Sequence, residues 1–217
     1  KSYLRKNPYV LSALCWCVYE GHIKEYDPKE IDKFDDFIKR ALYIVKNCEQ
    51  KPAEQEHFNP YVLTVKKVVK SYNDKSSTRN SKRSQEEIIK WLNLLNPEIL
   101  SEKCLISNID GEEYEQASSK EFYYQNIIKA YEKIGNYNEC ITLGEKALSV
   151  IKKFHYRNKT WIKARILYCK CMISEDIETD IEKYKQMAEK ERYWFMWYKL
   201  ANICYSFGKM KESLFFN

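Results

Sequence analysis

The 217-residue chain has 37 lysines and arginines against 31 aspartates and glutamates, which gives a formal net charge of +6 at pH 7. It is too long for a disulfide-stabilised miniprotein, and it has no apolar run near the roughly 20 residues that cross a bilayer. Five glycines and five prolines are few for this length, which favours helices joined by short turns over an all-β fold. The chain starts without methionine and stops inside a helical pattern, so we expect a fragment of a larger protein.

The pentapeptide NPYVL starts at Asn7 and again at Asn59, and it predicts the beginnings of two helices. An asparagine side chain caps the first turn of a helix, and a proline fits that turn well. After the first copy, apolar residues recur at helical spacing until Gly21, which is placed to end the helix. A second helix is predicted to begin at Asp27-Pro28. Its expected apolar face comprises Ile31, Phe34, Ile38, Ala41, Leu42 and Val45.

The second copy of the pentapeptide begins another pair of predicted helices. The buried face of the first comprises Val62, Val65, Val69 and Tyr72. The second begins at Ser84, where Ser84 and Glu87 match a capping box, and its apolar face comprises Ile88, Trp91, Leu92 and Leu95. Between these helices, residues 73–84 include no apolar residue and predict a solvated loop. Residues 108–111 predict a turn.

A recurring spacing begins at Tyr124 and continues to the end of the chain. From Tyr124, an aromatic follows seven residues later, a glycine eleven later, and Ala147 closes the unit. The spacing recurs 37 residues later, starting at Trp161, and again 36 residues after that, starting at Trp197. The positions that define it are Tyr124, Tyr131, Gly135, Ala147, Trp161, Tyr168, Trp197 and Gly208. Residues 116–217 thus resemble tetratricopeptide repeats, which are helix–turn–helix units of 34 residues, with the last repeat truncated.

The resemblance implies an all-α fold in which helical hairpins stack as a right-handed superhelix, an α-solenoid. Residues 1–115 match only as degenerate helical hairpins. In this family the repeat positions pack helices together, so we expect Trp161 to be buried between units. Such proteins bind a peptide or a partner protein on their concave surface and seldom catalyse reactions. We therefore expect a protein-interaction scaffold.

Catalytic and metal-binding motifs are missing from the sequence. The three histidines are scattered, and no nucleophile motif or glycine-rich phosphate loop accompanies them. The eight cysteines lack the spacing of zinc ligands, and they are expected to be core or surface thiols in a reducing, cytoplasmic setting. We therefore predict no enzymatic activity, no cofactor and no metal.

Residues 152–171 contain seven lysines and arginines and no acid. Aromatic residues interleave with these cations, so the segment could bind a nucleic-acid backbone or an acidic peptide, or it could be a solvated helix face. The candidate partner-binding residues form a set that we call the basic strip. They are Lys152, Lys153, Arg157, Lys159 and Lys163. An acidic protein partner is favoured. Single-stranded RNA or DNA binding and a regulatory role beside an enzyme domain stay open, and no membrane partner is expected.

Overall fold

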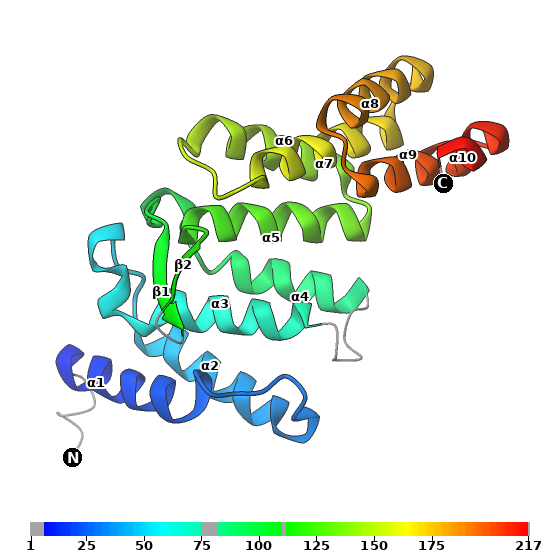
Figure 1. Cartoon of the computed structure of the whole chain (residues 1–217). Coiled ribbons are helices and arrows are strands. Elements are labelled where there is room, and N and C mark those ends of the chain that lie inside the picture. The colour runs from blue at the N-terminus through cyan, green and yellow to red at the C-terminus, as the bar shows by residue number, and fades with distance from the viewer. Residues whose placement is uncertain (1–6, 75–81, 110–111, 217) are drawn as a thin grey trace. The chain divides into compact units, whose positions relative to one another are not determined.

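The computed structural model describes residues 7–74, 82–109 and 112–216, and Figure 1 shows their helices and one pair of strands. The chain separates into two compact units, Lys1–Ala130 and Tyr131–Asn217. The division lies inside helix α5, beyond the boundary predicted after residue 115. Each unit has its own buried core, and the two are described separately below.

Helix α1 spans Pro8–Val18, and the Oδ1 atom of Asn7 accepts a hydrogen bond from the backbone N–H of Tyr9 at 3.0 Å. The predicted cap at the first pentapeptide is therefore confirmed. Gly21, however, does not end the helix, since it lies inside a π-helical turn, Tyr19–Ile23, that continues α1. The wider turn keeps Ile23 buried.

A short 3-10 turn, Ile31–Lys33, precedes α2, which spans Phe34–Asn47. The predicted apolar face of this helix is partly wrong. Its buried side chains are Phe37, Ala41 and Ile44, whereas Ile31 and Leu42 are exposed. The helix is therefore rotated from the predicted face, because the ring of Phe37 stacks on Tyr26 with a centroid distance of 4.0 Å.

Helix α3 spans Pro60–Asn73, and Asn59 caps it as predicted, with its Oδ1 2.9 Å from the N–H of Tyr61. The 3-10 turn Ala53–Phe58 precedes it. Every side chain predicted for the apolar face of α3 is buried. Most of the predicted polar loop, residues 75–81, lies outside the described residues.

Helix α4 spans Lys82–Leu92 and contacts α3. The predicted start at Ser84 is wrong, because Ser84 lies within the helix and is buried. All four residues predicted for its apolar side are buried. They are Ile88, Trp91, Leu92 and Leu95.

Unit 1 also contains a small antiparallel hairpin, which the sequence analysis did not predict. It follows the 3-10 turn Pro97–Ile99, and its strands are β1, Leu105–Ile109, and β2, Glu112–Gln116. Leu105 pairs with Gln116 and Ile109 with Glu112. Of the predicted turn, residues 108–109 belong to β1 and residues 110–111 lie outside the described residues. Apart from this hairpin, the regular elements in the described parts of the chain are helical.

The remaining helices follow one another in three sequential pairs, α5–α6, α7–α8 and α9–α10 (Figure 1). Their bounds are Ser119–Ile134 for α5, Tyr137–Val150 for α6, Asn158–Ile173 for α7, Ile177–Glu191 for α8, Trp194–Ser206 for α9 and Met210–Phe216 for α10. Within unit 2, α7 contacts α6, α8 and α9, and α9 also contacts α10.

The turns within the first and third pairs are built alike. Gly135 and Gly208 have positive φ angles of 82° and 74°, a conformation that glycine adopts without steric cost. After Gly135, the N–H of Asn136 donates to the carbonyl of Tyr131 at 3.0 Å. After Gly208, the N–H of Lys209 donates to the carbonyl of Cys204 at 2.8 Å. The two predicted turn glycines therefore end helices α5 and α9.

No helix among the described residues is long and apolar enough to cross a membrane.

Candidate functional site: an aromatic groove in unit 2

Most of the predicted repeat positions contribute to packing. Tyr124 and Ala147 are fully buried, while Tyr131, Tyr168 and Trp197 are partly buried. Gly135 and Gly208 lie in exposed turns. Among the other positions Trp161 is the exception, because 40% of its surface is exposed. The expectation that its ring is buried between units is therefore wrong.

Trp161 lines an open groove of about 400 Å³ in unit 2. The groove lies between α7 and α9, with the last turn of α5 at one end. Its lining consists of Glu132 from α5, Trp161 and Tyr168 from α7, and Trp194, Phe195, Tyr198, Lys199 and Asn202 from α9. Five of these eight side chains are aromatic, so the groove is largely apolar with a polar end.

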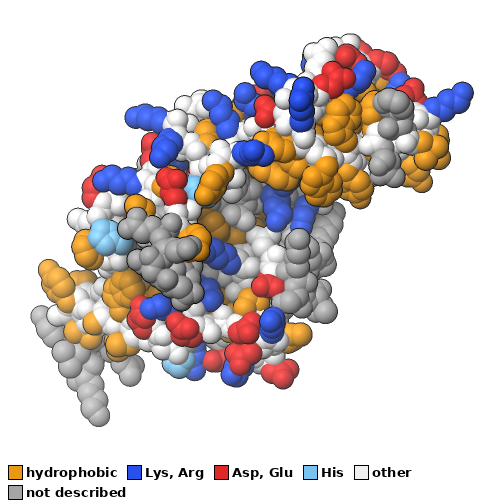
Figure 2. Space-filling view, in the orientation of Figure 1, with side chains coloured by type: hydrophobic (Ala, Val, Ile, Leu, Met, Phe, Trp, Pro, Cys, Tyr) orange, Lys and Arg blue, Asp and Glu red, His pale blue; other side chains and the backbone are white. Residues whose placement is uncertain are grey.

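Helical spacing explains why α9 supplies most of this lining. Trp194, Tyr198 and Asn202 are four residues apart, which places them on one side of the helix. Trp194 is 79% exposed and Tyr198 54%. The opposite side of α9 is buried in the core of unit 2 through Met196, Leu200 and related residues. The hydrophobic patch visible over α9 in Figure 2 lies on this unit.

Ring stacking orders the aromatic part of the groove. The rings of Trp161 and Phe195 are nearly parallel, with centroids 3.6 Å apart and an interplanar angle of 10°. Tyr193 also stacks on Phe195 at 5.5 Å, and the guanidinium of Arg157 lies 4.6 Å from the Tyr193 ring centroid. This row links the start of α7 to the start of α9. A stacked indole with one exposed side is a rigid apolar surface.

Glu132 is the centre of the polar end. Its carboxylate accepts hydrogen bonds from Arg165 of α7 and from Lys199 of α9, the latter at 2.5 Å. Its side chain is only 11% exposed. The ammonium of Lys199 also lies 4.4 Å from the ring centroid of Tyr168. One acid thus joins three helices that are far apart in sequence.

Burial and charge shift the pKa values at this end. Burial lowers the pKa of Lys199, and the neighbouring Arg165 lowers it further, whereas Glu132 opposes the shift. Burial raises the pKa of Tyr168 to about 12, with smaller effects from Tyr137 and Glu132. The Tyr168 hydroxyl therefore stays neutral at physiological pH.

The basic strip does not line the groove. Lys152 and Lys153 lie in the connection between α6 and α7, and Lys159 and Lys163 lie on α7, where all four are exposed. Each of these α7 lysines is two positions from Trp161 along the chain, which corresponds to a rotation of about 200° around a helix. Lys159 and Lys163 therefore point away from the side of α7 that carries Trp161. Arg157 differs from the lysines, since it packs on Tyr193.

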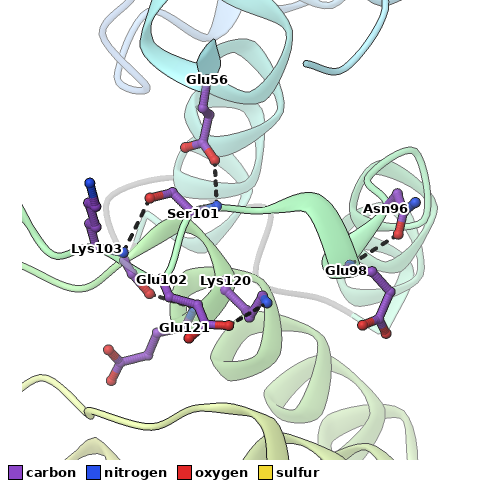
Figure 3. Close-up of polar contacts among 9 residues, drawn as sticks. Glu56, Asn96, Glu98, Ser101, Glu102, Lys103, Lys120 and Glu121 are labelled. Carbon is purple, nitrogen blue, oxygen red and sulfur yellow. Dashed lines mark hydrogen bonds and ion pairs between the residues drawn. The ribbon is translucent and has the colours of Figure 1, made fainter. Parts of the chain in front are cut away.

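A second polar cluster lies in unit 1, and Figure 3 shows its contact between Glu56 and Ser101. The Glu56 carboxylate accepts hydrogen bonds from the N–H of Ser101, at 2.9 Å, and from the Ser119 hydroxyl. The same hydroxyl accepts a hydrogen bond from Lys66 at 3.3 Å. These contacts tie the start of α5 to α3 and to the segment before β1. Because Ser119 is 1% exposed, we interpret the cluster as structural.

An adjoining cavity of about 300 Å³ is open to solvent and lies beside this cluster. Lys120 and Glu102 form an ion pair of 2.8 Å on its wall (Figure 3), and the N–H of Lys120 donates to the carbonyl of Ser101. The cavity is lined by charges of both signs and has no aromatic side chain. It therefore offers less selective binding than the groove.

The cysteines that pack inside the units behave as small apolar side chains. Burial raises the pKa of Cys15 and Cys171 to about 12. A hydrogen bond with Cys140, together with burial, raises the pKa of Cys169. Cys169 and Cys171 belong to one C-x-C pair but have different neighbours, since Cys171 packs with the α8–α9 core. The two thiols are thus not aimed at a common ligand.

Nothing matches this chain among protein-family models, curated proteins or solved structures. The tetratricopeptide resemblance accordingly depends on the residue spacing of residues 116–217.

Two residues that line the groove, Trp161 and Tyr168, were named from the sequence, but both were assigned to helix packing. It missed Glu132, Lys199 and the aromatic residues at the start of α9. One signal was available, namely the segment 193–198, YWFMWY, in which five of six residues are aromatic. A helix can bury only one side of such a run, so some of these rings had to be exposed.

Proposed function

We propose that this protein is an interaction module that binds a peptide segment of a partner protein in the groove between α7 and α9. The observation that carries the proposal is the exposed aromatic lining of an open groove of about 400 Å³. Exposed aromatic side chains that gather in one place mark binding surfaces, because they gain most from being covered.

The form of the groove favours a peptide ligand. It is open along its length, and its rings are held by stacking and by helix α9, so little side-chain entropy is lost on binding. One end offers hydrogen-bond donors from Lys199 and Asn202, which suit a polar group of an extended chain. A scaffold role agrees with the three sequential helix pairs and with the tetratricopeptide-like spacing. A right-handed superhelix and a cytoplasmic location are parts of the same proposal.

The experiment selects ligands from a phage-displayed library of random peptides and measures the affinity of the enriched sequences for the whole chain. Trp194→Ala and Tyr198→Ala remove exposed rings from the groove. Each is expected to weaken binding at least about tenfold, as for side chains central to an interface. Tyr205→Ala is the matched control, because Tyr205 is an exposed aromatic of α9 outside the groove lining.

Circular dichroism should give equal helix content for the three variants. Peptides that bind the Trp194 and Tyr198 variants as tightly as the wild type would place the binding surface elsewhere. Failure to enrich any peptide would contradict the proposal.

A further inference from the structure

Resting on the proposed function, we propose that the groove recognises an acidic–apolar motif inside a partner chain. In this motif a large apolar side chain covers the Trp161–Phe195 stack, and a side-chain carboxylate binds Lys199.

The apolar half follows from the arrangement of the rings. Trp161 stacks on Phe195 and is 40% exposed, so its ring leaves apolar surface for a ligand. Trp194 is perpendicular to Phe195, with an interplanar angle of 86° and centroids 6.4 Å apart. A parallel stack beside a perpendicular ring makes an apolar corner. Leucine, phenylalanine or tryptophan is of the right size to fill such a corner within a groove of about 400 Å³.

The acidic half follows from the hydrogen bonds of Lys199. An ammonium group has three N–H donors, and only the bond to Glu132 uses one of them among the described residues. The Lys199 side chain is 24% exposed and lines the groove, as does Asn202. These donors lie within a largely apolar surface, where a charge-assisted hydrogen bond is stronger than in water.

The balance of charge at the polar end selects an anion. Arg165 and Lys199 both bind Glu132, so these two cations share one carboxylate. A ligand carboxylate would reduce their mutual repulsion, whereas a ligand cation would increase it. Lys199 already lies over the Tyr168 ring, which is the position that a ligand cation would otherwise take.

A nucleic acid is a weaker candidate for the same groove. Stacked bases would require phosphate-binding cations beside the rings. Lys159 and Lys163 project from α7 away from Trp161, because each is two residues from it, and Arg157 packs on the Tyr193 ring. The carboxylate of a peptide needs only the Lys199 end. We therefore infer an acidic peptide, and nucleic-acid binding becomes an outcome of the test.

The experiment uses acetylated and amidated heptapeptides in which a central tryptophan or leucine is flanked by two aspartates. Matched peptides replace both aspartates by asparagine, and a third set replaces them by lysine. Calorimetry with the whole wild-type chain measures each dissociation constant. The aspartate peptides are expected to bind at least about tenfold more tightly than the asparagine peptides, the effect of one charge-assisted hydrogen bond. The lysine peptides should bind least.

A double-mutant cycle then assigns the preference to Lys199. In Lys199→Gln the aspartate and asparagine peptides are expected to bind alike, while in Lys159→Gln, an exposed lysine outside the groove, the preference should persist. The preference for aspartate over asparagine peptides is measured on the wild-type chain as well. A folding defect of Lys199→Gln therefore does not decide the outcome.

The possible results separate the two proposals. Groove-dependent binding without preference for aspartate overturns the acidic motif and leaves the peptide-binding function standing. Binding that needs a free C-terminal carboxylate, absent from the amidated peptides, overturns the internal motif. Binding of a single-stranded oligonucleotide that Trp194→Ala abolishes, with no peptide bound, overturns both.

Discussion

The Ile166 side chain of α7 occupies the space beside Gly144 of α6: a Cβ atom placed on Gly144 would lie 2.6 Å from Cγ1 of Ile166. Both residues are buried, and α6 and α7 are in extensive contact. Ile166 therefore fills the space that a larger side chain at position 144 would need.

Gly144→Ala should therefore destabilise the protein by about 1–3 kcal/mol, the usual cost of overpacking a core. Urea unfolding followed by circular dichroism gives the free energy of unfolding. Gly21→Ala is the control, because no atom lies within 4 Å of the corresponding Cβ position. Equal stability of Gly144→Ala and the wild type would show that α6 and α7 can separate at no cost.

Trp161→Ala should lower the free energy of unfolding far less than the replacement of a buried aromatic does. Its ring is 40% exposed and stacks on Phe195, so a loss of about 1–2 kcal/mol is expected from the stack and its partial burial. Tyr124→Ala, at a position 1% exposed, should cost about 3–5 kcal/mol. Chemical denaturation of both variants tests the order. If Trp161→Ala were the more damaging, the indole would be a core residue.

The buried Lys66 predicts a pH-dependent stability. Burial lowers its pKa from 10.5 to about 8, while Glu56 opposes the shift and Lys70 adds to it. Between these two pKa values the unfolded chain holds a proton that the folded chain has lost, so stability from this group rises with pH. The gain from pH 7 to pH 10 is about 2–3 kcal/mol, since one pKa unit corresponds to about 1.4 kcal/mol.

Other groups also titrate in this range, so the test compares Lys66→Met with the wild type. The difference in unfolding free energy, wild type minus variant, should increase between pH 7 and pH 10. Lys152→Met removes an exposed lysine and should show no such increase. A constant difference for Lys66→Met would mean that the ammonium is solvated in the folded protein.

The basic strip should not by itself make the protein a nucleic-acid binder. We expect no binding of a random single-stranded oligonucleotide at tens of micromolar protein in about 150 mM salt, where non-specific binders reach dissociation constants of about 10⁻⁴ to 10⁻⁶ M. Fluorescence anisotropy measures this binding. Micromolar affinity that disappears in a Lys152/Lys153/Arg157 triple alanine variant would reverse the ranking of protein and nucleic-acid partners.

Local sequence determined where many of the helices begin and end. Asn7 and Asn59 cap helices because an asparagine and a following proline act within one turn. Gly135 and Gly208 end helices because of their own backbone freedom. The apolar faces of α3 and α4 were also predictable, since each helix has one dominant apolar stripe. These signals depend on residues only a few positions apart.

The tertiary structure alone decided the rotation of α2, the π-helical turn at Gly21 and the strands β1 and β2. It also decided the groove, because its polar end joins Glu132 to Lys199, 67 positions away. Trp161 shows the physical reason. Spacing places its ring on a particular side of α7, but only the position of α9 determines that Phe195 covers one face of the ring and that the rest stays exposed.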